Sequence, residues 1–211
     1  MKNFEEFKNE IRRRAILHGA CAEQYIRFWK KTDFAGLCEV IRSNFIWCCN
    51  NIFDKELFEV YGDILGQYAI NYNKNVNSGC LMVDGRNSVK VGGNVTVYAK
   101  DEAYIVSDSY SHIIARDNTI VHAYRYENIE ASDNAEVDAY RGAYVIAFDD
   151  ARLELSGGCM AKMYDNTTAI VNDLVVVLGL NDNHIITQKE FKGAIIYQDK
   201  NHKFYLHETN R

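Results

Sequence analysis

The chain has 211 residues, a net charge of −5 and an ordinary share of apolar residues, which is enough for one or two folded domains. The mild negative charge argues against general nucleic-acid affinity, and no apolar run is long enough to span a membrane. The first residues lack the apolar core of a secretion signal, so the six cysteines are expected to be reduced thiols in the cytoplasm.

Residues 1–75 are predicted to form a helical domain. Phe4, Phe7 and Ile11 follow the spacing of one helix face, and the chain contains no proline that would break such helices. The stretch 71–79 is rich in asparagine, serine and glycine, and it is predicted to link this domain to the next.

From residue 81 to about residue 176 the sequence repeats in blocks of eight. The first position of each block is aliphatic, and the third and seventh positions are mostly small or apolar. Across a block boundary these three positions are two residues apart, so their side chains share one face of a β-strand. A single such strand cannot bury its apolar face, whereas stacked copies can, and the repeat therefore predicts a β-solenoid.

The fifth position of each block alternates between two kinds of turn. In one kind it is always aspartate: Asp101, Asp117, Asp133, Asp149 and Asp165. In the other it is Ser109, Arg125, Arg141, Gly157 and Asp173. The period is therefore about 16 residues, which predicts a parallel solenoid of two sheets over 76–180 with about six coils spaced by ~4.8 Å.

Residues 181–211 are predicted to form a C-terminal β cap. Ala194–Tyr197 and Lys203–Leu206 flank a polar turn and predict a hairpin. A solenoid leaves an open strand edge at each end, so we expect the helical domain to cover the first coil and this hairpin the last. The expected fold class is α+β.

The segment with Gly19, Ala20, Cys21, Trp29 and Trp47, followed by the octads, resembles a family of bacterial and phage proteins. These are uncharacterised octapeptide-repeat β-solenoid proteins of gut Bacteroidetes and bacteriophages, in which a helical Gly-Ala-Cys/Trp segment precedes the repeats. The resemblance implies no activity, cofactor or catalytic residue. It implies a phage or mobile-element origin, and the host cytoplasm as the location.

No catalytic, cofactor or metal site is expected. His18 and the nearby cysteines match no common zinc spacing, and they are expected to be structural. The stacked aspartates are expected to repel one another, with turn geometry and the nearby Lys100 and Arg116 offsetting the repulsion; a calcium ladder or a mimic of nucleic-acid charge is the functional alternative. His112 and His122 are expected on one polar sheet face near Asp138, as solvated groups.

The second kind of turn is the candidate partner-binding edge, because tyrosine and arginine dominate binding hot spots and are not needed there for folding. The predicted binding residues are Tyr110, Tyr124, Arg125, Tyr126, Tyr140 and Arg141. A ladder of stacked aromatics that only stabilises neighbouring coils is the alternative.

One outer sheet face is predicted to be apolar and to serve as an interface, either with the helical domain or with another copy in a homodimer. Its predicted residues are Met82, Tyr98, Tyr104, Ile114, Ile120 and Ile146.

These patterns favour a non-catalytic protein-binding module. With the family resemblance, the expected protein is a phage or mobile-element accessory factor that binds and inhibits a bacterial defence or toxin protein. A self-assembling structural solenoid and an enzyme acting on a polymer are the alternatives.

Overall fold

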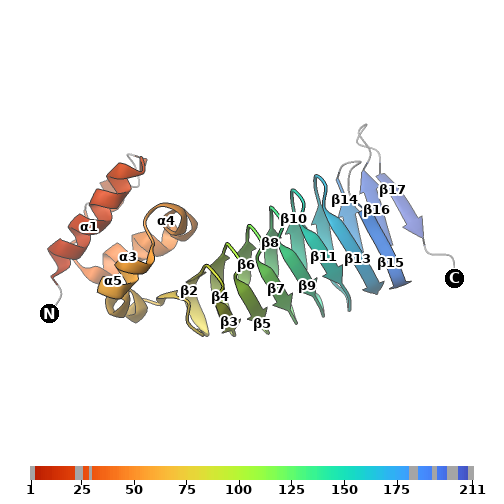
Figure 1. The fold of residues 1–211 in the computed structure, drawn as a ribbon, viewed down its shortest axis with the longest axis horizontal. Coiled ribbons are helices and arrows are strands. Elements are labelled where there is room, and N and C mark those ends of the chain that lie inside the picture. Colours follow the sequence, from red (N-terminus) through yellow and green to blue (C-terminus); the bar gives the residue numbers. More distant parts are fainter. Residues whose placement is uncertain are drawn as a thin grey trace. The chain divides into compact units, whose positions relative to one another are not determined.

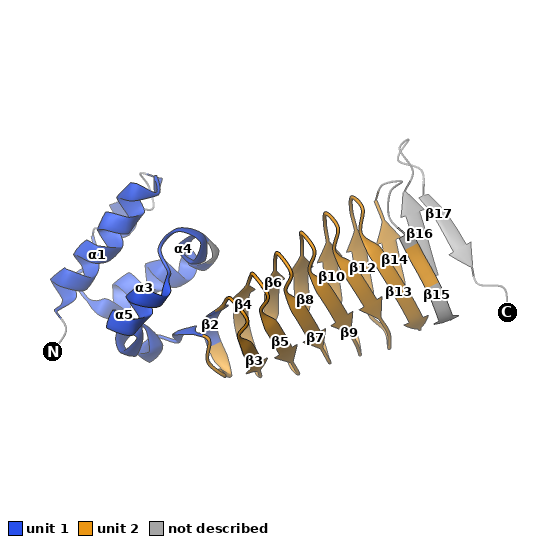
Figure 2. Cartoon of the chain, viewed as in Figure 1, with its two compact units in different colours: residues 1–72, 79–82 blue, residues 73–78, 83–211 orange. Residues whose placement is uncertain are grey.

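The computed structural model describes residues 3–21, 26–28, 30–180, 185–191, 194–198 and 204–208 (Figure 1). The chain divides into two compact units (Figure 2). A helical unit comprises residues 1–72 and 79–82, and a solenoid unit comprises residues 73–78 and 83–211. The predicted α+β class, with helices followed by a parallel two-sheet solenoid, is confirmed.

The helical unit packs its helices around an apolar core. Its helices include α1 Phe4–Leu17, α3 Phe34–Ser43, α4 Phe45–Asn51 and α5 Lys55–Gln67. Asp33 and Asp54 cap α3 and α5, because each carboxylate accepts a backbone N–H of the first turn. Phe7, Leu37 and Leu65 are fully enclosed in this core. The chain leaves the unit through β1 Ile70–Tyr72, which pairs in parallel with β2 Ser78–Val83. Within the predicted helical domain, residues 22–25 and 29 lie outside the described residues.

The strands of the solenoid alternate between two sheets. The even-strand sheet holds β4 Asn94–Ala99, β6 His112–Ala115, β8 Asn128–Ala131, β10 Tyr144–Ala147, β12 Met160–Met163, β14 Val176–Gly179 and β16 Ala194–Gln198. The odd-strand sheet holds β3 Ser88–Val91, β5 Tyr104–Ser107, β7 Ile120–Ala123, β9 Glu136–Ala139, β11 Arg152–Leu155, β13 Thr168–Asp173 and β15 Ile185–Phe191. Ile120 pairs in parallel with Glu136, sixteen residues later, so one coil holds two octads as predicted.

The repeat positions predicted to point inward do so. Val121 and Val137, at the first octad position, are buried, and so are Ala123 and Ala139 at the third. Small side chains at the strand ends let the two sheets approach closely, and hydrophobic burial of the aliphatic columns stabilises the stack.

Part of the predicted linker closes the first strand edge of the odd-strand sheet. The side-chain oxygen of Asn75 accepts the backbone N–H of Lys90 at 2.9 Å, and the Val76 carbonyl accepts that of Gly92 at 3.2 Å. Gly93 has φ +73° and would bring a Cβ to 2.0 Å from the Asn77 carbonyl oxygen, so only glycine fits there. Asn75, Val76 and Asn77 therefore occupy the place of a neighbouring strand.

The predicted C-terminal hairpin is also present. β16 pairs with β17 Phe204–Glu208 in the antiparallel sense, while β16 pairs in parallel with β14. The hairpin thus adds an antiparallel strand to the last described parallel strand of the even-strand sheet.

Candidate functional site

Two rows of turns connect the sheets, and they differ in chemistry. The aspartate edge consists of the turns that lead from the even-strand to the odd-strand sheet: 100–103, 116–119, 132–135, 148–151 and 164–167. The tyrosine–arginine edge consists of the turns that lead back: 108–111, 124–127, 140–143, 156–159 and 172–175. Because sixteen residues make one coil, turns of one kind lie above one another, as the sequence predicted.

On the aspartate edge, the carboxylates are used inside the fold. Each aspartate has a positive φ, between 54° and 61°, a conformation that aspartate tolerates better than most residues. One oxygen of the Asp117 carboxylate accepts the backbone N–H of Asp101, one coil earlier, at 2.9 Å. The same bond repeats from Gly85 up to Asp149, with N···O distances of 2.9–3.3 Å.

This ladder confirms the part of the expectation about charge repulsion that relied on turn geometry, and it corrects the part that relied on Lys100 and Arg116. Backbone amides, and not Lys100 or Arg116, are the groups that hold the stacked carboxylates, and bonds from N–H groups to a charged acceptor are stronger than neutral ones. The Arg116 guanidinium lies 5.8 Å from the centroid of the Tyr98 ring instead. The aspartate edge therefore has a structural explanation that needs no bound cation.

On the tyrosine–arginine edge, the aromatic rings stack between coils and stay exposed. Tyr110 and Tyr126 stack with centroids 5.8 Å apart, and Tyr124 and Tyr140 stack at 5.5 Å, both with ring planes 11° apart. Tyr110, Tyr124 and Tyr126 are 65%, 43% and 59% exposed. The structure thus brings the predicted tyrosines together in two parallel stacks that present their rings to solvent.

The two predicted arginines have different surroundings. Nε of Arg125 pairs with Asp108 at 2.8 Å. Arg141 is exposed, has φ +56°, and its guanidinium has no hydrogen bond or ion pair among the described residues. Sequence reasoning missed Asp108 as a member of this edge. Its signal was available, because Asp108 lies one coil before Tyr124 in the same turn position.

A buried glutamate holds the turns beneath this edge. Glu127 is fully enclosed although the seventh octad position is otherwise small or apolar in the central coils. Its two carboxylate oxygens accept the backbone N–H groups of Ser109 at 2.9 Å and of Arg125 at 2.8 Å. These amides have the same place in their turns as the amides bonded on the aspartate edge. The Glu127 carboxylate therefore accepts the turn amides of two coils, as the stacked aspartates accept the turn amides on the aspartate edge.

An open groove of about 520 Å³ runs along the tyrosine–arginine edge. Four of the six predicted binding residues line it: Tyr124, Arg125, Tyr140 and Arg141. Gly157 and Asp173 also line it. Gly157 has no side chain and lies between Arg141 and Asp173 in the stack of turns. Burial, with a smaller contribution from Asp138, raises the pKa of the Tyr140 hydroxyl, which therefore stays protonated and able to donate at neutral pH.

Exposed apolar side chains of the solenoid concentrate at this edge. Between residues 83 and 180, the exposed large apolar residues are Tyr104, Tyr110, Ile120, Tyr124, Tyr126, Met160, Leu174 and Val176. Four of them lie in the turns of the tyrosine–arginine edge, and Met160 and Val176 begin the strands that follow these turns. None lies in a turn of the aspartate edge. Clustered exposed apolar surface with arginine is typical of protein-interaction sites.

The predicted interface set does not share one sheet face, which corrects that part of the expectation. Tyr104 and Ile120 belong to the odd-strand sheet, whereas the other four lie on even-numbered strands: Met82, Tyr98, Ile114 and Ile146. The assignment failed because each strand crosses an octad boundary, so the eighth position, where Tyr104 and Ile120 lie, belongs to the strand of the following octad. Met82, Tyr98 and Ile114 are at most 4% exposed, so they do not form an open apolar surface. Their role as an interface stays a prediction.

The histidines predicted to share a face are also on different sheets. His112, in β6, lies 3.4 Å from a Glu130 oxygen, and His122, in β7, lies 3.0 Å from an Asp138 oxygen. Burial raises the pKa of Asp138, and the neighbouring His122 opposes that shift. This pair lies on a sheet face, where the Tyr104 ring contacts the His122 ring with centroids 5.2 Å apart.

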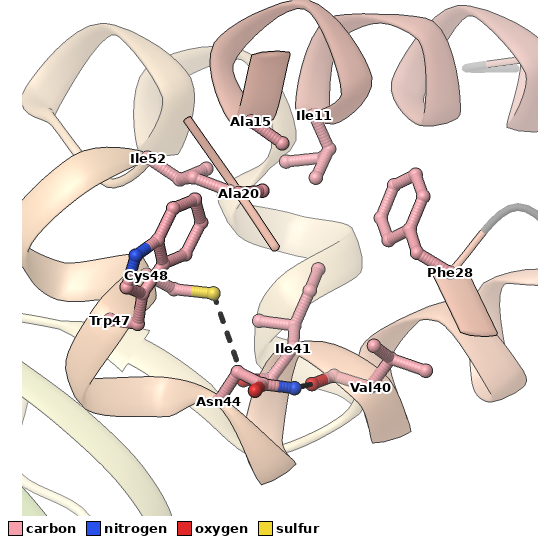
Figure 3. Close-up of a pocket in the computed structure, with 10 residues that line it drawn as sticks. All are labelled: Ile11, Ala15, Ala20, Phe28, Val40, Ile41, Asn44, Trp47, Cys48 and Ile52. Atoms are coloured by element: carbon pink, nitrogen blue, oxygen red, sulfur yellow. Dashed lines mark hydrogen bonds between the residues drawn. The ribbon is translucent and has the colours of Figure 1, made fainter. Parts of the chain in front are cut away.

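The helical unit holds a small apolar pocket that faces its own core (Figure 3). The volume is about 40 Å³, and Ile11, Phe28, Ile41, Trp47 and Cys48 are among the lining residues. Burial raises the pKa of the Cys48 thiol to about 12, so this thiol is neither a nucleophile nor a ready metal ligand at neutral pH. Among the described residues no group of histidine, cysteine or acidic side chains could hold a metal ion.

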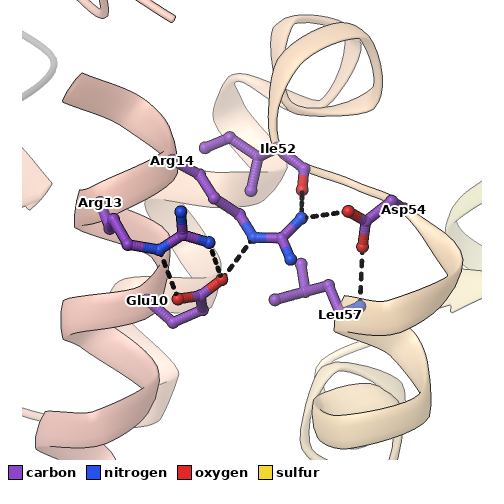
Figure 4. Close-up of polar contacts among 6 residues, drawn as sticks. All are labelled: Glu10, Arg13, Arg14, Ile52, Asp54 and Leu57. Carbon is purple, nitrogen blue, oxygen red and sulfur yellow. Dashed lines mark hydrogen bonds and ion pairs between the residues drawn. The ribbon is translucent and has the colours of Figure 1, made fainter. Parts of the chain in front are cut away.

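An ion network joins α1 to the start of α5 (Figure 4). The Arg14 guanidinium donates to Glu10, to Asp54 and to the Ile52 carbonyl. A hydrogen bond from Arg13, with a further one from Arg14 acting against partial burial, lowers the pKa of Glu10 to about 2. Every charge in this network is matched inside the unit, so its role is to fix the helices.

Comparisons with protein-family models, with curated proteins and with solved structures found no match for this chain. Among the described residues, no helix is both long and apolar enough to cross a membrane. The chemistry of the tyrosine–arginine edge itself is therefore the basis for a functional conclusion.

Proposed function

We propose that this protein is a non-catalytic protein-binding module that engages its partner through the tyrosine–arginine edge. The observation that carries the proposal is the concentration of exposed aromatic and apolar side chains, beside Arg125 and Arg141, in one row of turns. Stacked rings and internally bonded turns hold these side chains in place before binding. A preorganised surface loses little conformational entropy when it binds, which favours affinity.

The resemblance of the sequence to phage and Bacteroidetes repeat proteins narrows the proposed partner. We take it to be a bacterial defence or toxin protein in the cytoplasm, which this module inhibits by covering a functional surface. A rigid solenoid edge suits this role, because its regular spacing of ~4.8 Å between coils can oppose an extended protein surface.

The test is affinity capture from bacterial lysate with three versions of the purified chain. The binding variant Tyr124→Ala/Tyr140→Ala removes one exposed ring stack from the tyrosine–arginine edge. The matched control Phe148→Ala/Tyr164→Ala removes a stacked pair from the aspartate edge, whose rings lie 4.9 Å apart and 12° from parallel. A protein retained by the wild type and the control but lost by the binding variant supports the proposal.

The captured protein is then purified and titrated by calorimetry. We expect the binding variant to weaken the affinity by roughly 30-fold or more, the size of effect that a hot-spot residue produces. Equal affinity of both double variants for the same protein would place the binding surface elsewhere and overturn the proposal. Retained inhibition of the partner's activity by the binding variant would count against the inhibitor role alone.

A further inference from the structure

The later coils of the tyrosine–arginine edge carry two unmatched charges of opposite sign. Arg141 and Asp173 are both exposed, both line the groove, and both have a positive φ, at 56° and 57°. Neither side chain has a hydrogen bond or ion pair among the residues that the structure describes, whereas Arg125 on the same edge is paired with Asp108. A cation and an anion therefore remain available to a partner.

These two charges lie symmetrically about a glycine. Arg141, Gly157 and Asp173 occupy the same turn position in three successive coils, because Ala139 pairs with Leu155 and Leu155 pairs with Val171. At ~4.8 Å per coil the two charges are separated by roughly 10 Å, one coil on either side of Gly157. A Cβ at Gly158, beside it, would meet no atom within 4 Å, so the centre of this patch is open.

The patch also carries exposed apolar groups on both sides of its centre. Leu174, next to Asp173, is 57% exposed, and Gly142, next to Arg141, has no side chain. The Tyr126 ring covers Gly142 so closely that a Cβ there would lie 2.9 Å from a ring carbon. The edge thus presents an exposed leucine one coil beyond its centre and, one coil before it, the exposed Tyr126 ring lying over Gly142.

A two-fold axis through the centre of this patch matches each feature with its complement. If a second copy faces the first with its coils running in the opposite direction, Arg141 of each copy lies opposite Asp173 of the other. The same rotation places Leu174 opposite Gly142 and the Tyr126 ring that lies over it. Each residue contacts its complement twice in such an isologous interface, which is the usual arrangement in a homodimer.

We propose that a second copy of this chain binds this patch, forming an antiparallel, edge-to-edge homodimer centred on Gly157. Apolar contact of Leu174 with Tyr126 stabilises the pair, while the two Arg141–Asp173 pairs fix its register. This self-contact goes beyond the proposed function and does not require it. A protein partner that uses Arg141 competes with the second copy for the same groove.

Charge reversal tests this arrangement with little risk to folding. Arg141→Asp introduces a residue type that this chain already holds at positive φ at six other positions, and Asp173→Arg introduces the type found at Arg141 itself. Light scattering coupled to size exclusion measures the molar mass of each purified variant over a wide concentration range. Circular dichroism confirms that the fold is retained, so loss of dimer is not confused with unfolding.

The wild type is expected to approach twice the chain mass of 24.2 kDa as concentration rises. Each single reversal creates two like-charge pairs and should weaken dimerisation by about tenfold or more. An equimolar mixture of Arg141→Asp with Asp173→Arg should recover the dimer, because every pair is again of opposite sign. The double variant Arg141→Asp/Asp173→Arg should recover it alone.

The control is Asn134→Asp, and separately Asn134→Arg, which change the charge of an exposed position on the aspartate edge. Both should dimerise as the wild type does. A wild type that stays monomeric at every concentration overturns the inference, and so does a dimer that single reversals leave unchanged or that the mixture does not restore. These outcomes come from the purified chain alone, so they are separate from the result of partner capture.

Discussion

The two edges of the solenoid solve the same structural problem with different side chains. On the aspartate edge, each turn uses its own carboxylate to bond the amide of the coil before it. On the tyrosine–arginine edge, the enclosed Glu127 bonds the amides of two coils from inside the stack. The aspartate edge needs an aspartate at the exposed turn position of each coil. Where Glu127 supplies the acceptor from inside, the exposed turn positions of the tyrosine–arginine edge can vary.

This difference separates the residues that build the fold from those that are available to a partner. Aspartate recurs in coil after coil on one edge because each copy meets the same backbone demand. On the other edge the same position is serine, arginine, glycine or aspartate, and tyrosines flank it in the central coils. Variation at a fixed place in a repeat therefore indicates a surface whose side chains the fold does not require.

The largest expected effect comes from removing the internal carboxylate. Glu127→Ala leaves two enclosed backbone N–H groups without an acceptor, so we expect a loss of about 3 kcal/mol in the free energy of unfolding. Urea denaturation followed by circular dichroism measures it. Glu127→Gln keeps one acceptor oxygen, so its free energy of unfolding should lie between those of the alanine variant and the wild type. An alanine variant as stable as the wild type would show that Glu127 does not replace the aspartate ladder.

A smaller loss is expected on the opposite edge. Asp133→Ala removes one acceptor for the Asp117 amide and places alanine at φ 59°, which should cost about 2 kcal/mol. Asp133→Asn keeps an acceptor oxygen and tolerates the same backbone, so most of the stability should remain. Thermal and urea unfolding of the two variants decide this. If asparagine is as harmful as alanine, the charge and not the turn geometry is the important property.

The third prediction concerns the close contact between Gly142 and the Tyr126 ring. Gly142→Ala meets the Tyr126 ring at 2.9 Å and strains a backbone with φ +91°, and we expect about 1–2 kcal/mol of destabilisation. In a Tyr126→Ala background only the backbone strain remains, so the penalty should fall. A double-mutant cycle by urea unfolding measures this coupling. A penalty of equal size in both backgrounds would mean that the ring moves aside freely.

The smallest expected effect is that of an exposed ring. Tyr124→Ala should cost at most about 1 kcal/mol, since its side chain is 43% exposed and its main contact is the stack with Tyr140. Phe148→Ala, in the half-buried pair of the aspartate edge, should cost more. Matched thermal melts compare them. The reverse order would assign the tyrosine stack to stability rather than to binding.

The octads were sufficient to predict the strands, the sixteen-residue coil and the two kinds of turn, because each depends on a repeated local pattern. Stacking of Tyr110 on Tyr126 followed from the same register. The faces of the sheets were harder, since Tyr98 and Tyr104 belong to the same octad but lie on strands of opposite sheets, because each strand crosses an octad boundary. A single slip in that count exchanges one wall of the solenoid for the other.

Contacts that break the repeat could not be predicted from it. Glu127 is visible in the sequence as an exception at an inward position, but the amides that it bonds depend on the folded turns. The same holds for Asn75, whose side chain bonds β3 although the sequence around it indicates a linker. Where a residue departs from the repeat pattern, the repeat gives little information about which groups that residue will hydrogen-bond.

The sixteen-residue coil also constrains how such a gene can change in length. Deleting or duplicating sixteen codons removes or adds a whole coil and keeps every remaining turn on its own edge. A change of eight codons would carry aspartate turns onto the tyrosine row for the rest of the chain, and it would separate Glu127 from the amides that it bonds. We therefore expect natural length variants of this solenoid to differ by whole coils.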